Sequence, residues 1–341
     1  MRTITITTAL VALVTATGCG ANGGQQASAT PSADVTGTLF VGNKREDTLS
    51  KIDLASGEEV RRVATCDDPH ELSVSPDRAH VALACYGGTG VEIFDTETLE
   101  KVAYVELGEN AQPHGIVWHA SGRLIATAEG RGTMFVVEDP LADDPGVREI
   151  GTNRGPGPHM VAIDDDFSFA WGVVIPTGEV IRYDLASGEE TGRHDFEGQA
   201  EAVALAPDGS ALWVGSNSKG IAYRMDPETL APQEEVATGR IPIRIATHPD
   251  GAWAVTSNVA EGTLSVIDTA RNETVRTIEV SDSSDKVLVT LVFSQDGERL
   301  YAAQTRSNMI AEIDFATGEV LRRMPTGEGG DGLAVTGPDG G

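Results

Sequence analysis

A unit of 42 to 46 residues recurs seven times along this chain of 341 residues, and the repeat limits the possible folds more than any other feature. Each copy holds an apolar strand, a turn, two further strands, an Asp-centred turn and a fourth strand. The first turn of each copy lies at Pro76-Asp77, Ser121-Gly122, Asp165-Asp166, Pro207-Asp208-Gly209, Pro249-Asp250-Gly251, Gln295-Asp296-Gly297 and Pro338-Asp339-Gly340. Four short strands per copied unit are typical of propeller blades. The sequence therefore predicts an all-β fold, a seven-bladed β-propeller of four-stranded blades.

The phase of the repeat at its two ends predicts how the ring closes. Residues 38–42 match the second strand of a unit, whereas residues 332–336 match a first strand. We expect the C-terminal strand to pair into the N-terminal blade. Such pairing removes sheet edges that would otherwise be open to other chains.

The first residues have the features of an export signal. Arg2 precedes an apolar run over residues 4–16, which is too short to span a membrane, and small residues lead to Cys19. The pattern resembles the bacterial lipobox, which implies cleavage before Cys19 and a diacylglycerol on its sulfur. A secreted protein without a lipid is the alternative. We expect an extracytoplasmic lipoprotein on the outer face of the cell membrane.

Three segments follow from these patterns. Residues 1–18 are the expected signal peptide, and residues 37–341 carry the repeats of the propeller. The segment between them, 19–36, is rich in Gly, Gln, Ser, Ala and Thr and has almost no large apolar residue. It cannot bury enough surface to fold, so we expect a flexible tether.

The charge of the chain limits its partners. A formal net charge of −27 excludes a nucleic-acid-binding protein, which needs a basic surface, and opposes adsorption to anionic lipid. The expected partners are the membrane through the lipid anchor, and a small molecule or a protein at one face. We expect a monomer.

Two cysteines remain once Cys19 carries a lipid. Cys66 precedes the first strand of its unit and Cys85 ends the antiparallel partner strand, so the two lie near each other in one hairpin. An oxidising compartment allows them to form a disulfide. Two buried free thiols are the alternative.

The repeat resembles that of the YVTN family of β-propeller proteins. The resemblance covers residues 37–341 and is carried by Trp213-Val214-Gly215-Ser216-Asn217, Thr263-Leu264-Ser265-Val266-Ile267-Asp268 and Leu205-Ala206-Pro207-Asp208-Gly209. It implies the propeller fold and says little about function, because related propellers include lactonases, electron-transfer subunits and binding proteins.

One position of the repeat, at the start of the innermost strand, gathers residues that can bind a metal or a proton. Seven residues before the Asp of each turn, or before Ser121 where the turn has no Asp, lie His70, His114, His159, Glu201, Ile243, Val289 and Gly332. Pro precedes each of the three histidines and fixes the backbone that enters the strand. Arg244 and Asp331 lie one residue from their ring positions. Since innermost strands surround the central channel, we expect these side chains to converge at its mouth.

Imidazoles and a carboxylate are suitable ligands for zinc or another borderline divalent metal. Glu129, in a loop facing the same mouth, is a further ligand or a partner of one. The expected metal ligands are His70, His114, His159, Glu201 and Glu129, and Arg244 and Asp331 join the ring histidines and Glu201 in a small-ligand site.

Two alternatives to a metal or ligand site remain open. In a lactonase-like hydrolase, Arg244 would bind a carboxylate or phosphate, while His or Glu would activate water. In the other alternative, the mouth is only hydrated and structural. The sequence leaves open whether the protein is an enzyme.

Overall fold

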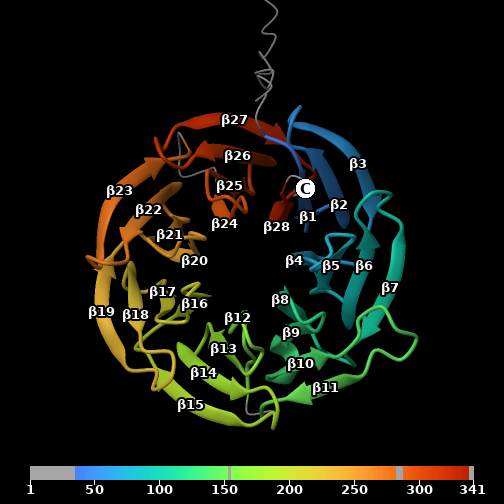
Figure 1. Ribbon diagram of the computed structural model, residues 1–341, viewed down its shortest axis with the longest axis horizontal. Helices are drawn as coiled ribbons and strands as arrows, with labels where there is room; N and C mark the ends of the chain where they lie inside the picture. Colours follow the sequence, from blue (N-terminus) through green and yellow to red (C-terminus); the bar gives the residue numbers. More distant parts are fainter. Residues whose placement is uncertain (1–34, 153–154, 282–286, 338–341) are drawn as a thin grey trace, which may run out of the picture.

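The computed structural model describes residues 35–152, 155–281 and 287–337, and these form seven four-stranded antiparallel sheets around a central axis (Figure 1). This confirms the predicted seven-bladed β-propeller. The expected signal peptide, the lipidated Cys19, most of the tether and the turn at Pro338 lie outside the described residues.

The blades follow one another around the ring, each with its innermost strand at the channel. Blade 1 consists of β28 (Gly330–Thr336), β1 (Thr38–Asn43), β2 (Thr48–Asp53) and β3 (Glu58–Ala64). Blade 2 consists of β4 (Pro69–Val74), β5 (His80–Cys85), β6 (Gly90–Asp95) and β7 (Lys101–Glu106). Blade 3 consists of β8 (Pro113–Trp118), β9 (Leu124–Ala128), β10 (Thr133–Val137) and β11 (Val147–Ile150), with the 3-10 helix η1 (Glu129–Arg131) between β9 and β10.

The remaining four blades have the same order. Blade 4 consists of β12 (Met160–Ile163), β13 (Phe169–Val174), β14 (Glu179–Asp184) and β15 (Glu190–Asp195). Blade 5 consists of β16 (Ala200–Leu205), β17 (Leu212–Ser216), β18 (Ile221–Met225) and β19 (Pro232–Ala237). Blade 6 consists of β20 (Pro242–Thr247), β21 (Trp253–Asn258), β22 (Thr263–Asp268) and β23 (Glu273–Glu279). Blade 7 consists of β24 (Leu288–Phe293), β25 (Arg299–Gln304), β26 (Met309–Asp314) and β27 (Val320–Pro325).

The C-terminal strand closes the ring as predicted. β28 pairs antiparallel with β1, with Thr38 opposite Thr336 and Val41 opposite Leu333. The backbone N–H of Thr38 also donates to Oγ1 of Thr336 at 3.0 Å. The first described strand therefore has a partner on each side, β2 and β28.

The Asp-centred turns explain why the repeat keeps its sequence. In one copy, Oδ1 of Asp53 accepts the backbone N–H of Ser56 at 2.7 Å, and Gly57 follows with φ +74°. Asp184 and Asp314 cap their turns in the same way. The carboxylate satisfies a turn N–H, and glycine takes a left-handed conformation that strains other residues.

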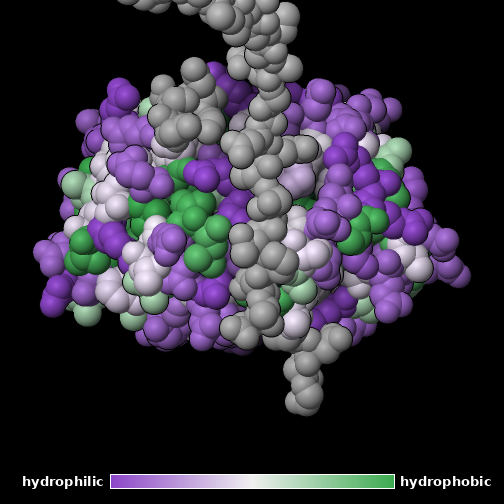
Figure 2. Space-filling view, turned by 90° about the horizontal axis from the view of Figure 1, so that it is seen from above, coloured by the Kyte–Doolittle hydropathy of each residue, from purple (hydrophilic) through white to green (hydrophobic). Residues whose placement is uncertain are grey.

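The hydrophobic core lies between neighbouring blades. Blades 2 and 3 share one apolar cluster, which includes Leu124 and Phe135, and each of the other six blade contacts has its own. On the side of the ring that Figure 2 shows, the coloured surface is mostly hydrophilic, with isolated apolar patches. Among the described residues, no helix is long and apolar enough to cross a membrane.

Candidate functional site

Most ring residues lie in β-bulges at the start of the innermost strands, whereas His159 directly precedes β12, whose pairing with β13 is regular. In blade 2 the pairing of β4 with β5 shifts between Pro69 and Leu72, so His70 lies within the irregularity, and β8 shifts around His114 in the same way. β16 shifts around Glu201. A bulge breaks the alternation of side chains and re-aims the extra residue. Side chains that regular strands would place between blades can therefore point into the channel.

The three ring histidines form a continuous row of ring contacts, called here the histidine stack, although their planes are tilted. The ring centroids of His70 and His114 are 4.7 Å apart at an interplanar angle of 56°, and those of His114 and His159 are 3.6 Å apart at 34°. All three residues are buried, and His114 is only 2% exposed. Among the described residues, Nδ1 of His114 has no hydrogen-bond partner. The histidine stack thus buries a nitrogen that no described residue satisfies.

Glu129 joins this stack from η1, at the loop after β9. Its Oε1 contacts Nδ1 of His159, and its Oε2 accepts the Tyr86 hydroxyl at 3.0 Å. Donor atoms of His114, Glu129 and His159 all lie within 4.8 Å of one another. The backbone of Gly157 passes against the same loop, where a Cβ would come within 2.8 Å of Glu129 Cα. Glycine is required there by this close approach.

Arg244 crosses the channel from β20 to β4, which lie on opposite sides of the axis (Figure 1). Its Nε and Nη2 donate to Glu71 Oε1 at 3.2 and 2.9 Å. Nη1 donates to Glu201 Oε1 at 3.1 Å and to the carbonyl of Ile243 at 2.9 Å. Four of its five N–H groups are therefore engaged. Arg244, which a lactonase-like reaction would use to bind an anionic substrate, is therefore already paired with the carboxylates of Glu71 and Glu201.

The expected residue Asp331 lies in the same channel with a partner of its own. It is 1% exposed, and its Oδ2 accepts Nζ of Lys44 at 2.6 Å. Oδ1 accepts the hydroxyl of Thr290 at 3.3 Å. Asp331 therefore belongs to an ion pair with blade 1 and is outside the cluster of donor atoms at His114.

Burial and charge shift the pKa values of the two neighbouring histidines in opposite directions. Burial lowers the pKa of His114 well below its usual value, and the nearby His159, His70 and Arg244 lower it further. Burial also lowers the pKa of His159, but the carboxylates of Glu129 and Glu201 outweigh it, so the net shift is upward. The surroundings therefore favour the neutral form of His114 and, relative to a free imidazole, the protonated form of His159.

The neighbouring acids and the phenol respond to the same surroundings. Burial opposes ionisation of Glu201, yet His159 and Arg244 lower its pKa overall. Burial and the Glu129 carboxylate raise the pKa of Tyr86 to about 12. Tyr86 is thus a hydrogen-bond donor, and Glu201 an anion, across the physiological range.

The structure brings the sequence-predicted residues together in part. His114, His159 and Glu129 share one cluster, and His70 stacks on it with Nδ1 3.0 Å from the Asp68 carbonyl. Oε1 of Glu201 lies 3.5 Å from Nε2 of His159, but Glu201 also receives Arg244 and, on Oε2, the amide of Asn217. The ligand roles stay predictions.

Sequence reasoning missed Glu71, Tyr86 and Lys44. Glu71 directly follows His70, and this adjacency to the ring position was the available signal, since the bulge that turns Glu71 to the channel is visible only in the structure. Tyr86 follows Cys85 in a loop, where tyrosine usually indicates only packing. Lys44 belongs to the loop after β1, which no repeat position marks.

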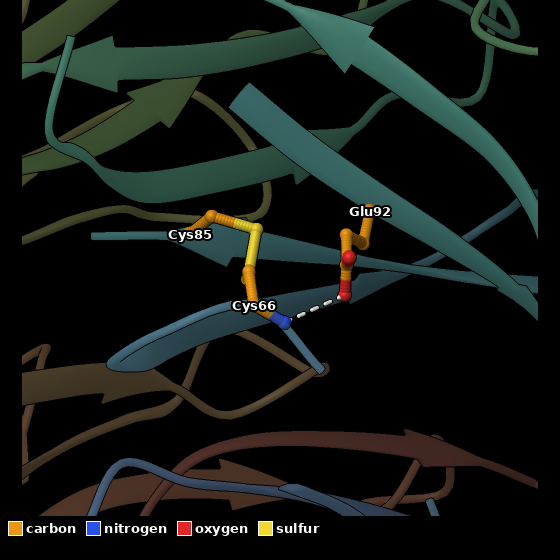
Figure 3. A group of neighbouring side chains, drawn as sticks. All are labelled: Cys66, Cys85 and Glu92. Carbon is orange, nitrogen blue, oxygen red and sulfur yellow. Dashed lines mark hydrogen bonds between the residues drawn. A yellow bond between two sulfur atoms is a disulfide. The ribbon is translucent and has the colours of Figure 1, made fainter. Parts of the chain in front are cut away.

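The predicted disulfide is present between Cys66 and Cys85 (Figure 3). Oε2 of Glu92 accepts the backbone N–H of Cys66 at 3.0 Å, and its Oε1 accepts Nζ of Lys101 at 2.8 Å. Both sulfurs are bonded to each other and so provide no thiolate for a metal. The bond joins the segment before β4 to the loop that carries Tyr86, where the N–H of Tyr86 donates to the carbonyl of Asp68 at 3.2 Å.

A hollow of about 300 Å³ opens beside the histidine stack. Glu129, His159 and Gly157 line it together with Gln112, Pro156, Ile175 and Pro176. The donor residues Glu129 and His159 are therefore reached from the surface, although both are largely buried.

Comparisons with known proteins identify the fold and leave the function open. No protein-family model matches the sequence, and no curated protein is significantly similar to it. Many solved structures share the fold. One is described as dihydro-heme d1 dehydrogenase NirN in complex with DHE. It superimposes with a TM-score of 0.66 at 15% sequence identity, over 90% of this chain and 77% of that chain. A likeness at this level of identity shows the propeller alone.

Proposed function

We propose that this protein binds one divalent transition-metal ion at the channel mouth through His114, His159 and Glu129. The observation that carries the proposal is that one donor atom from each of the three residues lies within 4.8 Å of the others, beside a buried nitrogen of His114, Nδ1, that has no partner among the described residues. Ligand atoms of a tetrahedral zinc site lie about 3.4 Å apart, as bonds of about 2.0–2.1 Å require. Side-chain rotations would therefore have to bring the more distant donor atoms closer and to separate Oε1 of Glu129 from Nδ1 of His159, which contact each other directly.

The charges of the channel mouth support a divalent cation. Among the described residues, four largely buried carboxylates gather here, and Arg244 and Lys44 are the cations that pair with them. These four belong to Glu71, Glu129, Glu201 and Asp331. A fifth, Asp68, lies 3.5 Å from Nδ1 of His70, but its side chain is 43% exposed and is screened by solvent. With neutral histidines, two negative charges remain in surroundings that penalise unpaired charge. One divalent ion neutralises them.

The pKa shifts of the two histidines act on metal binding in opposite directions: burial favours the neutral form of His114, whereas at His159 a metal must compete with a proton. A metal ligand must be a neutral imidazole, and burial already keeps His114 neutral. His159 has a raised pKa, so a metal displaces a proton from it. Two imidazoles and one carboxylate suit zinc, and they also suit iron(II).

Tyr86 and His70 support the three donors. The Tyr86 hydroxyl occupies Oε2 of Glu129, which leaves Oε1 toward His159. Nδ1 of His70 lies 3.0 Å from the Asp68 carbonyl, and this contact holds the His70 ring against His114. Groups that orient ligands in this way typically contribute 10- to 100-fold to metal affinity.

The similar structure of NirN is in complex with DHE, and we propose an ion rather than a macrocycle for this chain. The His114 and His159 rings are stacked at 3.6 Å, which leaves no space for a planar group between them. An absorption spectrum of the purified protein without a Soret-type band supports the ion, whereas such a band contradicts it.

The test is elemental analysis of the purified protein, before and after loading with Zn²⁺. We expect one metal ion per chain. His114→Ala and His159→Ala should each reduce affinity by more than the roughly 10- to 100-fold loss typical of a supporting residue. His119→Ala is the matched control, because His119 lies near the turn after β8 and bonds Ser121. Absence of stoichiometric metal in the wild-type protein contradicts the proposal.

We propose that the propeller is an extracytoplasmic lipoprotein held through Cys19, and that its repeat relates it to the YVTN proteins. The Cys66–Cys85 disulfide supports this location, because disulfides persist in oxidising compartments. Cys19→Ala should release the protein from the membrane fraction and abolish lipid labelling. Unchanged membrane association contradicts the anchor.

A further inference from the structure

The hollow beside the histidine stack reaches two of the three proposed metal-binding residues. Glu129 and His159 lie at its floor, whereas His114 does not line it and is 2% exposed. A metal ion held by three protein donors retains a position for a further ligand. The hollow is therefore the side from which such a ligand can arrive.

The lining of the hollow is about half apolar and half polar. Pro156, Ile175 and Pro176 provide the apolar part, and Gln112, which is exposed, lines it together with Glu129 and His159. Gln112 takes the left-handed backbone conformation, with φ +46°, and its carbonyl accepts the N–H of Glu129 at 3.3 Å. The strained backbone of Gln112 is thus hydrogen-bonded to Glu129, one of the three proposed metal-binding residues. At about 300 Å³, the space is at the small end of ligand pockets.

The charge balance limits what the hollow can hold. With one divalent cation present, the four carboxylates and the two cationic side chains of the channel mouth are neutralised. An anion added beside the metal would leave one unpaired negative charge among largely buried groups, which is unfavourable. A neutral ligand adds no unpaired charge.

We propose that the hollow binds a small neutral molecule whose nitrogen or oxygen lone pair completes the coordination of the metal. Its apolar part lies against Pro156, Ile175 and Pro176, and the Gln112 amide is available to its polar edge. The inference rests on the proposed metal site and adds the class of ligand that this site accepts.

The test uses protein loaded with Co²⁺, whose visible absorption reports its coordination. The probes are imidazole, which is neutral and compact, and azide, which is a compact anion. We expect imidazole to change the spectrum saturably and to bind at least about tenfold more tightly than azide. Both titrations are run above pH 7.5 so that imidazole is unprotonated.

Variants locate the ligand without disturbing the metal. Ile175→Trp fills the hollow and should weaken imidazole binding at least about tenfold while one Co²⁺ per chain remains bound. Leu141→Trp is the control, because Leu141 is 43% exposed in the loop between β10 and β11, away from the hollow. It should leave both titrations unchanged.

Each contrary result has a separate meaning. Azide binding as tightly as imidazole overturns the preference for a neutral ligand. An unchanged imidazole titration in Ile175→Trp overturns the hollow as the binding place. Absence of bound Co²⁺, measured by elemental analysis, overturns the metal site and this inference together, whereas bound Co²⁺ with a silent imidazole titration overturns only the inference.

Discussion

Removal of the Cys66–Cys85 disulfide should lower the stability of the propeller by an amount that the fold allows us to calculate. The bond links residues 19 positions apart and closes a loop that spans β4 and β5. In the chain-entropy treatment, a loop of this length corresponds to about 3.3 kcal/mol at 25 °C. We expect Cys66→Ala/Cys85→Ala to lose about this much free energy of unfolding.

Loss of the packing around the Cys85 sulfur should lower the free energy of unfolding by a smaller further amount. Cys85 is fully buried and packs with Leu83 and Phe94 between blades 1 and 2, so its truncation removes apolar contacts as well. The single variant Cys66→Ala breaks the bond but keeps this sulfur. It separates the entropic effect from the packing effect.

The assay is equilibrium unfolding in urea, with the wild-type protein oxidised and with both cysteines reduced. The midpoint of the reduced protein should match that of Cys66→Ala, and reductant should not affect the double variant. A loss below about 1 kcal/mol in all three would refute the reasoning, because loop closure would then contribute little to the unfolded ensemble.

Three further predictions concern the ring and its channel. Removal of residues 330–341 deletes β28, and we expect a large fall in melting temperature; an unchanged melt contradicts closure by this strand. Burial opposes ionisation of Asp331, but Lys44 and Arg244 lower its pKa overall. The Asp331 carboxylate therefore stabilises the fold above the pKa of the unfolded chain, about 3.9, and this stabilisation is lost as the solution becomes more acidic. Asp331→Asn should weaken the fall of the urea midpoint at acidic pH, and an unchanged fall would contradict a stabilising role of this carboxylate. Arg244→Met leaves Glu71 buried without its cation and should cost about 3–5 kcal/mol in urea unfolding; Glu71→Gln in the same chain should recover part of it, and full additivity of the two changes would argue against the pair.

The fold could be predicted from sequence because each blade is specified locally. Asp53 and Gly57 mark a turn by their own hydrogen-bonding and backbone preferences, and the same signal recurs at Asp184 and Asp314. Residues 38–42 match the second strand of a unit and residues 332–336 match a first strand, and this mismatch identified the strand that closes the ring. These features depend on neighbours in the chain and need no knowledge of distant contacts.

The site was less predictable because bulges and distant pairs decide it. One aligned position per blade identified His70, His114 and His159, yet a bulge lets a second residue face the channel, which is how Glu71 reaches Arg244 over 173 positions. The alignment of ring positions likewise could not predict that the Glu201 carboxylate contacts both Arg244 and His159. Pairings across the channel depend on the closed ring.

Closure of the ring by β28 also determines when the propeller can finish folding. Thr38 and Thr336 are separated by 298 positions, and joining the ends of so long a flexible segment costs about 5 kcal/mol of chain entropy. Contacts this remote in sequence form slowly, and during synthesis β1 waits for a partner that is made after all the other described strands. The nascent chain therefore carries an open inner edge on blade 1 until β28 has been made, and that edge is where premature pairing with other chains would begin.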